Sequence, residues 1–311
     1  MANSYTHKEL IELAPLESVI VEGLLLGGIY SLAAIGISLI FSITNILNLA
    51  HGNFIMIGGV LSFIFYYAFA GSNPAIITLV VTLALVLLCS AFLGVATDTL
   101  LIKRIFRSKD IIGSAVLVTI GLALVLQDFG SYIIINDEAN VSHTSTVALS
   151  IPNFGSFQLG GYYFASSKIV SLLAITLASV ALFFFFKRTY LGLAMRSISQ
   201  DREAASISGV NIRSISLLTF VLGSVFAGFA GFVLVIDQTV DPVLGIPYTI
   251  KLLTIMVLGG VRSPLGPVMG GILLGILESA VAIFFGAYWV TAASLAILIS
   301  VLLVRPSGIG G

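Results

Sequence analysis

Residues 168–186 read KIVSLLAITLASVALFFFF, and the one charged side chain in this stretch is Lys168 at its start. The stretch is close to the length of about 20 helical residues that crosses a bilayer core about 30 Å thick. Lys187 and Arg188 follow directly, and basic residues next to a helix end mark its cytoplasmic side. We therefore predict that 168–186 is a transmembrane helix whose C-terminal end faces the cytoplasm.

The composition of the whole chain points to lipid as the solvent. Of its 311 residues, 58% are hydrophobic and only 9% are charged, and the mean hydropathy is +1.14. Soluble domains carry about 25% charged residues, so a surface this poor in charge would not stay dissolved in water. The net charge of zero gives no indication of nucleic-acid binding. The single cysteine, Cys89, excludes a disulfide framework and a thiolate metal cage.

Apolar runs of about spanning length recur along the chain. They lie at 19–43, 54–70, 75–97, 112–135, 168–186, 212–236, 249–261, 267–286 and 288–304. The runs 54–70 and 249–261 are short, and both full and partial crossing are open for them. We predict an all-α, polytopic membrane protein of about nine spans, with residues 1–311 forming one transmembrane domain.

Small residues recur four positions apart in several of these runs. The pairs are Gly23 and Gly27, Ala227 and Gly231, Gly266 and Gly270, and Gly271 and Gly275. This spacing places small side chains on one helical face, which lets membrane helices pack closely. Because the pattern is common in helical membrane proteins, it identifies no function.

The basic residues predict the orientation in the plasma membrane. Alternation of nine spans places 11 of the 14 Lys and Arg residues on one face, which is expected to be cytoplasmic. These are Lys103, Arg104, Arg107, Lys109, Lys187, Arg188, Arg196, Arg202, Arg213, Arg262 and Arg305. The opposite face collects Glu9, Glu12, Glu17, Asp137, Glu138, Asp237 and Asp241. We predict an N-terminus outside, a cytoplasmic C-terminus and an extracytoplasmic loop at about 136–167.

The spans on either side of 168–186 fit an inverted repeat of four plus four. The two sets run in opposite directions, and each has its shortest segment second. Those short segments carry similar strings, Met56-Ile-Gly-Gly-Val60 and Val257-Leu-Gly-Gly-Val261. Short or glycine-interrupted helices in matching positions indicate the midplane site of a transporter. A chance recurrence of Gly-Gly in a chain with 31 glycines is the alternative.

The basic segment 190–211 predicts a short cytoplasmic helix at about 197–209. Ser199 is a suitable N-cap, acidic residues at 201 and 203 favour the first turn, and Gly209 suits the position after the helix end. The string Glu203-Ala204-Ala205 followed by Gly209 matches the EAA-xxx-G signature of ABC importer permeases. We predict ATPase-coupling residues at Arg196, Asp201, Glu203, Ala204, Ala205 and Gly209. A solvated loop helix without a partner is the alternative.

Several strings in the chain resemble the branched-chain amino acid ABC transporter permease family. They are Gly23-LLLGGIYS-Leu32, Asn48-LAH-Gly52, Met56-Ile-Gly58, Val257-LGG-Val261 with Gly266 and Gly270-Gly271, and Arg305-PSGI-Gly310. They occur in family order over nearly the whole chain, and the subunit type that the chain resembles carries the Asn-x-Ala-His-Gly region. The chain departs from the family pattern at Leu49, Arg262 and Pro267, which bears on substrate preference.

The resemblance implies an importer for branched-chain or other hydrophobic amino acids. Such an importer has two permease subunits, often different chains, two cytoplasmic ATPase subunits and an extracytoplasmic solute-binding protein. The chain carries no Gly-xxxx-Gly-Lys-Ser/Thr phosphate loop, because no lysine in it follows a glycine. ATP and Mg²⁺ are therefore expected on partner subunits, and this chain is expected to be neither an enzyme nor a cofactor carrier.

Polar residues inside the spans are candidates for the translocation path or its gate. The candidates are Asn48, His51, Gly52, Gly58, Gly59, Gly259, Gly260 and Glu278. His51 at a helix break is either a proton carrier or a partner for freed backbone groups. Glu278 either binds the ammonium group of the substrate, pairs with Lys251, or accepts hydrogen bonds from serines at a subunit contact. Asp128, beside Gln127, is a similar carboxylate nearer the outer surface.

Two other functions are compatible with the sequence. One is an ABC permease for another small solute, such as a sugar, urea or an amide. The other is an ATP-independent secondary transporter in which Glu278, Asp128 and His51 carry ions or protons. The pocket chemistry of a neighbouring solute-binding protein would distinguish the first, and transport without an ATPase would favour the second.

Overall fold

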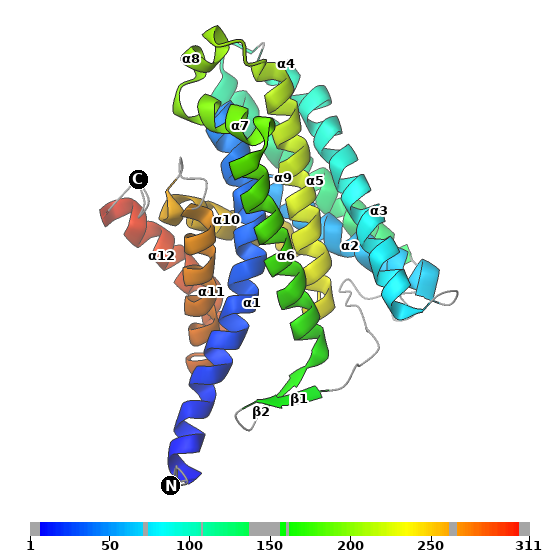
Figure 1. Ribbon diagram of the computed structural model, residues 1–311, viewed down its shortest axis with the longest axis vertical. Helices are drawn as coiled ribbons and strands as arrows, with labels where there is room; N and C mark the ends of the chain where they lie inside the picture. The colour runs from blue at the N-terminus through cyan, green and yellow to red at the C-terminus, as the bar shows by residue number, and fades with distance from the viewer. Residues whose placement is uncertain are drawn as a thin grey trace.

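The computed structural model describes residues 7–70, 74–106, 108–136, 156–159, 162–260 and 266–304. Twelve α-helices and one hairpin lie in these ranges (Figure 1), with one π-helical and two 3-10 turns between them. The long helices are α1 (His7–Thr44), α2 (His51–Ala70), α3 (Ala75–Ala96), α5 (Ile111–Asn136), α6 (Ser166–Arg188), α9 (Ile212–Asp237), α10 (Gly245–Gly259), α11 (Gly266–Phe284) and α12 (Val290–Val304). The short elements are α4 (Lys103–Ile105), β1 (Ser156–Leu159), β2 (Tyr162–Ala165), α7 (Tyr190–Gln200) and α8 (Arg202–Ile207).

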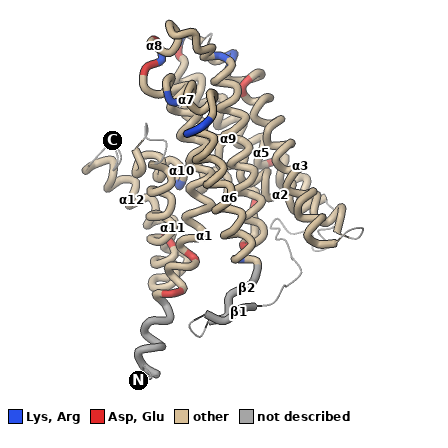
Figure 2. Tube along the Cα trace, in the orientation of Figure 1, with Lys and Arg blue, Asp and Glu red and all other residues tan. Residues whose placement is uncertain are grey.

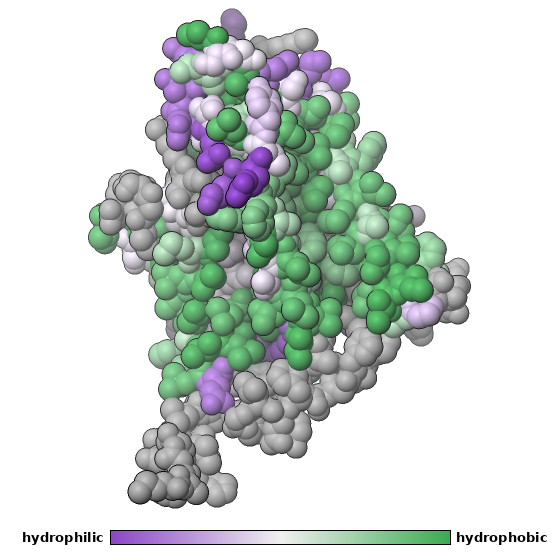
Figure 3. Space-filling view, in the orientation of Figure 1, coloured by the Kyte–Doolittle hydropathy of each residue, from purple (hydrophilic) through white to green (hydrophobic). Residues whose placement is uncertain are grey.

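The predicted polytopic helical fold is confirmed. Within the described ranges, nine helical stretches are long and apolar enough to cross a membrane. An apolar belt covers the middle of the molecule in Figure 3, and polar residues gather toward its upper end. The exception to an all-helical chain is the antiparallel hairpin β1–β2, which lies in the predicted loop 136–167. Residues 137–155 of that loop lie outside the described part.

Two helices, α2 and α10, begin earlier than their apolar runs predicted and deep inside the molecule. α2 begins at His51, whose Nε2 lies 3.1 Å from the carbonyl oxygen of Ala33 on α1. Ala33 is about 16 Å from the Thr44 end of α1 at 1.5 Å per residue. The chain therefore turns back into the protein after α1 and starts α2 near the middle. α10 likewise follows a 3-10 turn at Pro242–Leu244.

The starts of α2 and α10 touch each other. The Gly52 N–H donates to the Thr249 hydroxyl at 2.9 Å, and that hydroxyl is 3.0 Å from the carbonyl oxygen of Leu49. A Cβ on Gly52 would clash with the carbonyl oxygen of Gly245, so only glycine permits this approach. From this junction α2 runs to the side of α3 and α10 to the side of α12 (Figure 1).

The packing of the helices follows the predicted four-plus-four repeat. α1 packs on α11 as α3 packs on α9, and α2 contacts α5 as α10 contacts α12. In the repeat, α1, α2, α3 and α5 of the first half correspond to α9, α10, α11 and α12 of the second. The α1–α11 contact therefore corresponds to the α9–α3 contact, and the α2–α5 contact to the α10–α12 contact. The two Gly-Gly strings, however, have different structural roles. Gly58 lies against Gly228 of α9, whereas Gly260, with φ +93°, ends α10.

Glycines bring α1 and α11 into backbone contact. A Cβ on Gly23 would lie 2.6 Å from the Cα of Ile276, and one on Gly27 would lie 2.7 Å from the Cα of Ile272. On the facing helix, a Cβ on Gly275 would clash with the backbone nitrogen of Gly27. The close packing that the small-residue spacing predicted is therefore present at this interface.

Charged residues of the described chain are distributed unevenly. Lys and Arg gather at the end of the molecule that carries α7 and α8 (Figure 2). Arg107, Asp137, Glu138, Arg262 and Arg305, which the orientation argument also used, lie outside the described residues. The distribution supports the predicted cytoplasmic position of this end, which labelling can test.

We predict that residues 109 and 288 lie on opposite sides of the membrane. Lys109 is exposed between α4 and α5, and Tyr288, 99% exposed, lies between α11 and α12. In a Cys89→Ser background, an impermeant thiol reagent added to intact cells should label Tyr288→Cys and spare Lys109→Cys until the cells are opened. Labelling of both positions from one side would contradict the nine-span topology.

We also predict that Gly275→Ala destabilises the protein whereas Gly121→Ala does not. The methyl group at 275 would force α1 and α11 apart, because the backbone of Gly27 occupies its space. At Gly121 on α5, no atom lies within 4 Å of an added Cβ, and alanine is the better helix former. Thermal unfolding in detergent should show a lower midpoint for Gly275→Ala, and equal midpoints for the two variants would refute the packing argument.

Candidate functional site

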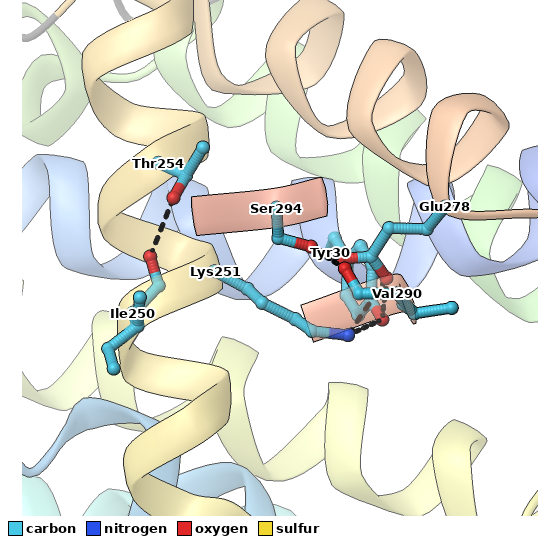
Figure 4. Close-up of polar contacts among 7 residues, drawn as sticks. All are labelled: Tyr30, Ile250, Lys251, Thr254, Glu278, Val290 and Ser294. Carbon is cyan, nitrogen blue, oxygen red and sulfur yellow. Dashed lines mark hydrogen bonds and ion pairs between the residues drawn. The ribbon is translucent and has the colours of Figure 1, made fainter. Parts of the chain in front are cut away.

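Glu278 lies in the middle of α11 and is only 2% exposed. Its Oε2 accepts hydrogen bonds from the Tyr30 hydroxyl of α1 at 2.8 Å and from the Lys251 ammonium of α10 at 2.8 Å. Its Oε1 accepts one from the Ser294 hydroxyl of α12. Figure 4 shows these side chains converging on the carboxylate. Helices α1, α10, α11 and α12 thus meet at a single charged group.

The Lys251 ammonium completes this cluster. The ammonium donates to the Tyr30 hydroxyl at 3.0 Å, and the Lys251 side chain is 14% exposed. It also lies over the rings of Tyr30 and Tyr248, at 5.2 and 5.7 Å from their centroids. Aromatic faces attract a cation electrostatically. The ammonium is therefore held by one carboxylate, one hydroxyl and two aromatic faces.

Of the roles that the sequence left open for Glu278, the geometry favours pairing with Lys251. Both carboxylate oxygens are engaged, so an incoming ammonium group would have to displace Lys251 or a hydroxyl. The serine contact that the sequence suggested is present as well, but Ser294 belongs to the same chain and not to a second subunit. Tyr30 and Ser294 were missed as members of the site. The position of Tyr30 inside the family-like string Gly23–Leu32 was the one available signal.

The helix break before α2 contains a second polar cluster. Asn48, His51 and Asn53 are fully buried. The Asn48 side chain accepts from the Ala50 N–H at 3.1 Å, and the Asn53 amide donates to the carbonyl oxygen of Ala123 at 2.9 Å. The first contact satisfies a backbone N–H at the break, as membrane proteins require, whereas the second attaches the start of α2 to the middle of α5. Among the described residues, no carboxylate contacts His51, which favours its structural role over a proton relay.

Three polar atoms at this break have no hydrogen-bond partner among the described residues. They are Asn48 Nδ2, His51 Nδ1 and Asn53 Oδ1. Buried polar groups of this kind are usually satisfied by ordered water or another polar molecule. Three of the nine such side-chain atoms in the described part of the chain therefore lie at the break, where the starts of α2 and α10 meet.

The predicted path residues do not form one site. Asn48, His51 and Gly52 lie at the junction of α2 and α10. Glu278 lies in the separate cluster with Lys251, and Tyr248 stands beside Thr249 of the junction. The glycines lie elsewhere. Gly58 and Gly59 pack against Gly228 and Val240, and Gly259 and Gly260 are at the far end of α10, next to Gly266.

The predicted coupling segment forms two helices instead of one. α7 ends at Gln200 and α8 begins at Arg202. The N-cap of α8 is Asp201, whose carboxylate accepts from the N–H groups of Glu203 and Ala204 at 2.9 and 3.0 Å. The predicted N-cap Ser199 was wrong, because its hydroxyl donates to the carbonyl oxygen of Arg196 inside α7. The extended backbone of Asp201, with φ −150°, separates the two helices.

The remaining coupling residues divide into an inner and an outer set. Ala205 is buried against Ile43 and Ile215, whereas Glu203 and Ala204 are exposed. Gly209 has φ +85°, in the left-handed region that favours glycine after a helix end. Ile207 was missed by the sequence analysis and is 89% exposed at the tip of α8. The outer face of α8 is thus small and apolar with charged flanks.

Polar contacts tie α8 to the membrane helices. The Arg202 guanidinium donates to the carbonyl oxygen of Ile43 near the end of α1 at 3.4 Å, beside a cavity of about 500 Å³. After α8, Arg213 of α9 forms two hydrogen bonds with the fully buried Asp98. Asp98 belongs to a π-helical turn at Thr97–Ile102, which continues α3. Arg202 of α8 thus contacts α1, and Arg213 at the start of α9 connects α9 to the end of α3.

We predict that Glu278→Leu prevents stable assembly, because it leaves the Lys251 ammonium buried without its carboxylate. Breaking one partner of a buried pair costs about 3–5 kcal/mol. Glu278→Gln keeps the shape and most hydrogen bonds and should cost less. The double variant Lys251→Met/Glu278→Leu removes both charges and should regain the yield and thermal midpoint that Glu278→Leu loses. A double variant less stable than the single one would show that the pair is not the cause.

Comparison with known proteins agrees with these features. Residues 19–304 match the family described as branched-chain amino acid transport system / permease component. The chain is 31% identical to the high-affinity branched-chain amino acid transport system permease protein LivH of Escherichia coli K12, over 93% of each chain. It is 28% identical to BraD of Pseudomonas aeruginosa, a permease protein of the same kind of system, over 94% of each chain. Among solved structures, PsaBC from Streptococcus pneumoniae in complex with Fab shares the fold, with a TM-score of 0.52 and 14% identity over 97% of each chain. The chain therefore belongs to the branched-chain amino acid permease family.

Proposed function

We propose that this protein is the permease subunit of an ABC importer that translocates branched-chain or other hydrophobic amino acids. The family match over residues 19–304 carries this proposal. A solute-binding protein delivers the amino acid on the extracytoplasmic side. Two ATPase subunits bind ATP and Mg²⁺ in the cytoplasm, and a second, related permease chain completes the membrane part.

The exposed face of α8 is the proposed contact with an ATPase subunit. Ala204 and Ile207 offer a small apolar surface, and Arg202 and Glu203 offer charges beside it. Two contacts support a mechanical role: Arg202 connects this surface to α1, and Arg213, which follows α8 in the chain, connects α9 to α3. ATP binding that moves α8 would then shift α1, α9 and α3 together.

The junction of α2 and α10 is the proposed centre of the conformational change. Both helices begin there, and hydrogen bonds of the Thr249 hydroxyl with Gly52 and Leu49 hold the two starts together. Discontinuous helices near the midplane are typical of transporter binding sites and gates. The Lys251–Glu278 pair holds α10 against α11 in the arrangement seen here. Because that carboxylate is already paired, the structure offers less support for ion-coupled secondary transport.

The function can be tested with the intact importer. The complex purified with its partner subunits should hydrolyse ATP faster when the loaded solute-binding protein is present. Leucine, isoleucine and valine should produce this stimulation, and sugars and urea should not. Stimulation by a sugar or by urea instead of the amino acids would overturn the substrate class. Uptake in the absence of any ATPase subunit would overturn the importer itself.

We predict that Ala204→Trp uncouples ATP hydrolysis from uptake. An indole ring on the exposed face of α8 is too large for a helix seated in a groove, whereas the fold of the isolated subunit has room for it. The importer should assemble in reduced or normal amount and hydrolyse ATP, while leucine uptake falls about tenfold or more, as expected for a lost interface contact. Lys109→Trp, on the other predicted cytoplasmic loop, is the matched control and should retain uptake. Normal uptake with Ala204→Trp would exclude α8 as the contact.

A further inference from the structure

Asp128 is a charged residue on the outward face of α5. The buried residues of this helix form one stripe, Ala115, Thr119, Ala123, Leu126, Gly130 and Ile134. Asp128 is two positions from both Leu126 and Gly130, which is about 200° around a helix of 3.6 residues per turn. Its side chain therefore points directly away from the rest of the protein, and it is exposed.

The exposed neighbours of Asp128 on this face are mainly apolar, and the half-buried Gln127 and Ser131 lie beside them. Leu124 and Tyr132 stand one turn away on either side, and both are exposed. Asp98 and Glu278, two buried carboxylates of the membrane helices, are each paired with a basic side chain. Asp128 has no ion pair and no hydrogen-bond partner within the part of the chain that the structure describes.

Asp128 is also too deep for its side chain to reach the lipid headgroups. The carbonyl oxygen of Ala123 accepts from Asn53 at the start of α2, so Ala123 is level with the helix break in the middle of the molecule. Asp128 is about 7.5 Å further along the axis at 1.5 Å per residue. Half of a hydrocarbon core is about 15 Å, which leaves the carboxylate well inside it.

A carboxylate at this depth does not face lipid, because ionisable groups within membrane segments face the bundle interior or a water-filled cavity. Here the bundle interior is on the opposite side of α5. The outward face of α5 around residue 128 must therefore border water or another protein chain in the assembled importer.

We propose that this face of α5 lines the aqueous solute path and that Asp128 binds the ammonium group of the passing amino acid. The inference rests on the proposed function. A single carboxylate between Leu124 and Tyr132 matches a ligand that carries one ammonium group and an apolar side chain. A basic side chain of the second permease subunit is the competing occupant, and the experiments below separate the two.

The first experiment measures access of water to this position in the whole importer. In a Cys89→Ser background, Asp128→Cys should react with a cationic, water-soluble methanethiosulfonate reagent, and leucine with its binding protein should slow the reaction. Phe92→Cys on α3 is the control, because residue 92 is 75% exposed on an apolar helix and should stay unreactive in lipid. An Asp128→Cys as unreactive as the control would overturn the proposal.

The second experiment measures the role of the charge. Asp128→Asn should lower leucine uptake about tenfold, the size expected for the loss of one charge-assisted hydrogen bond, while Asp128→Glu stays within about threefold. The amount of assembled importer should be equal for both variants. Normal uptake by Asp128→Asn would refute ammonium binding, and loss of assembly in Asp128→Asn but not Asp128→Glu would identify a basic partner residue instead.

Uptake by the unmodified importer separates this inference from the proposed function. If it transports leucine and the Asp128→Asn variant does so equally well, only the role of Asp128 fails. If it transports a solute without an ammonium group, the proposed function and the ammonium assignment both fail, whereas reactivity of Asp128→Cys would still show that α5 borders water.

Discussion

Within a bilayer every backbone N–H and C=O group needs a partner inside the protein, and this requirement determines how the centre of the molecule is built. α2 and α10 both start there, so their first N–H groups would be unsatisfied in lipid. The Thr249 hydroxyl accepts from Gly52 and donates to Leu49 or Gly245, and the Asn48 side chain accepts from Ala50. Short polar side chains thus replace the missing helical turns, and the remaining helices pack around this junction.

Buried charge follows the same rule at two distant places. Glu278 is matched by Lys251, two hydroxyl groups and the aromatic rings that cover the ammonium. Asp98 is matched by both terminal nitrogens of Arg213. The first pair joins α10 to α11 in the interior, and the second joins α9 to α3 near the predicted coupling segment. Each pair therefore holds two membrane helices together.

The sequence predicted the spans well because, in a chain this poor in charge, a run of about 20 apolar residues is explained by a helix that crosses the bilayer. It predicted the starts of α2 and α10 less well. His51, Asn53, Tyr248 and Lys251 interrupt the apolar runs, and composition alone does not reveal that other helices satisfy them. Ser199 and Asp201 are both good N-cap residue types, so the sequence does not distinguish them, and only the backbone shows that Asp201 is the N-cap. The partners Tyr30 and Ser294 are distant in sequence from Glu278 and became visible only through packing.

The contact between α1 and α11 also bears on how the protein moves. Where Gly27 meets Gly275, backbone touches backbone, so no side chain is available to change rotamer and let one helix slide over the other. Close-packed interfaces have discrete arrangements and do not deform continuously. α1 and α11 are therefore expected to travel as one rigid body. Opening and closing of the protein would then be taken up by helices with few buried residues, such as α12, where 6% of the residues in the membrane span are buried. The α1–α11 pair would move as a unit, and those helices would rearrange around it.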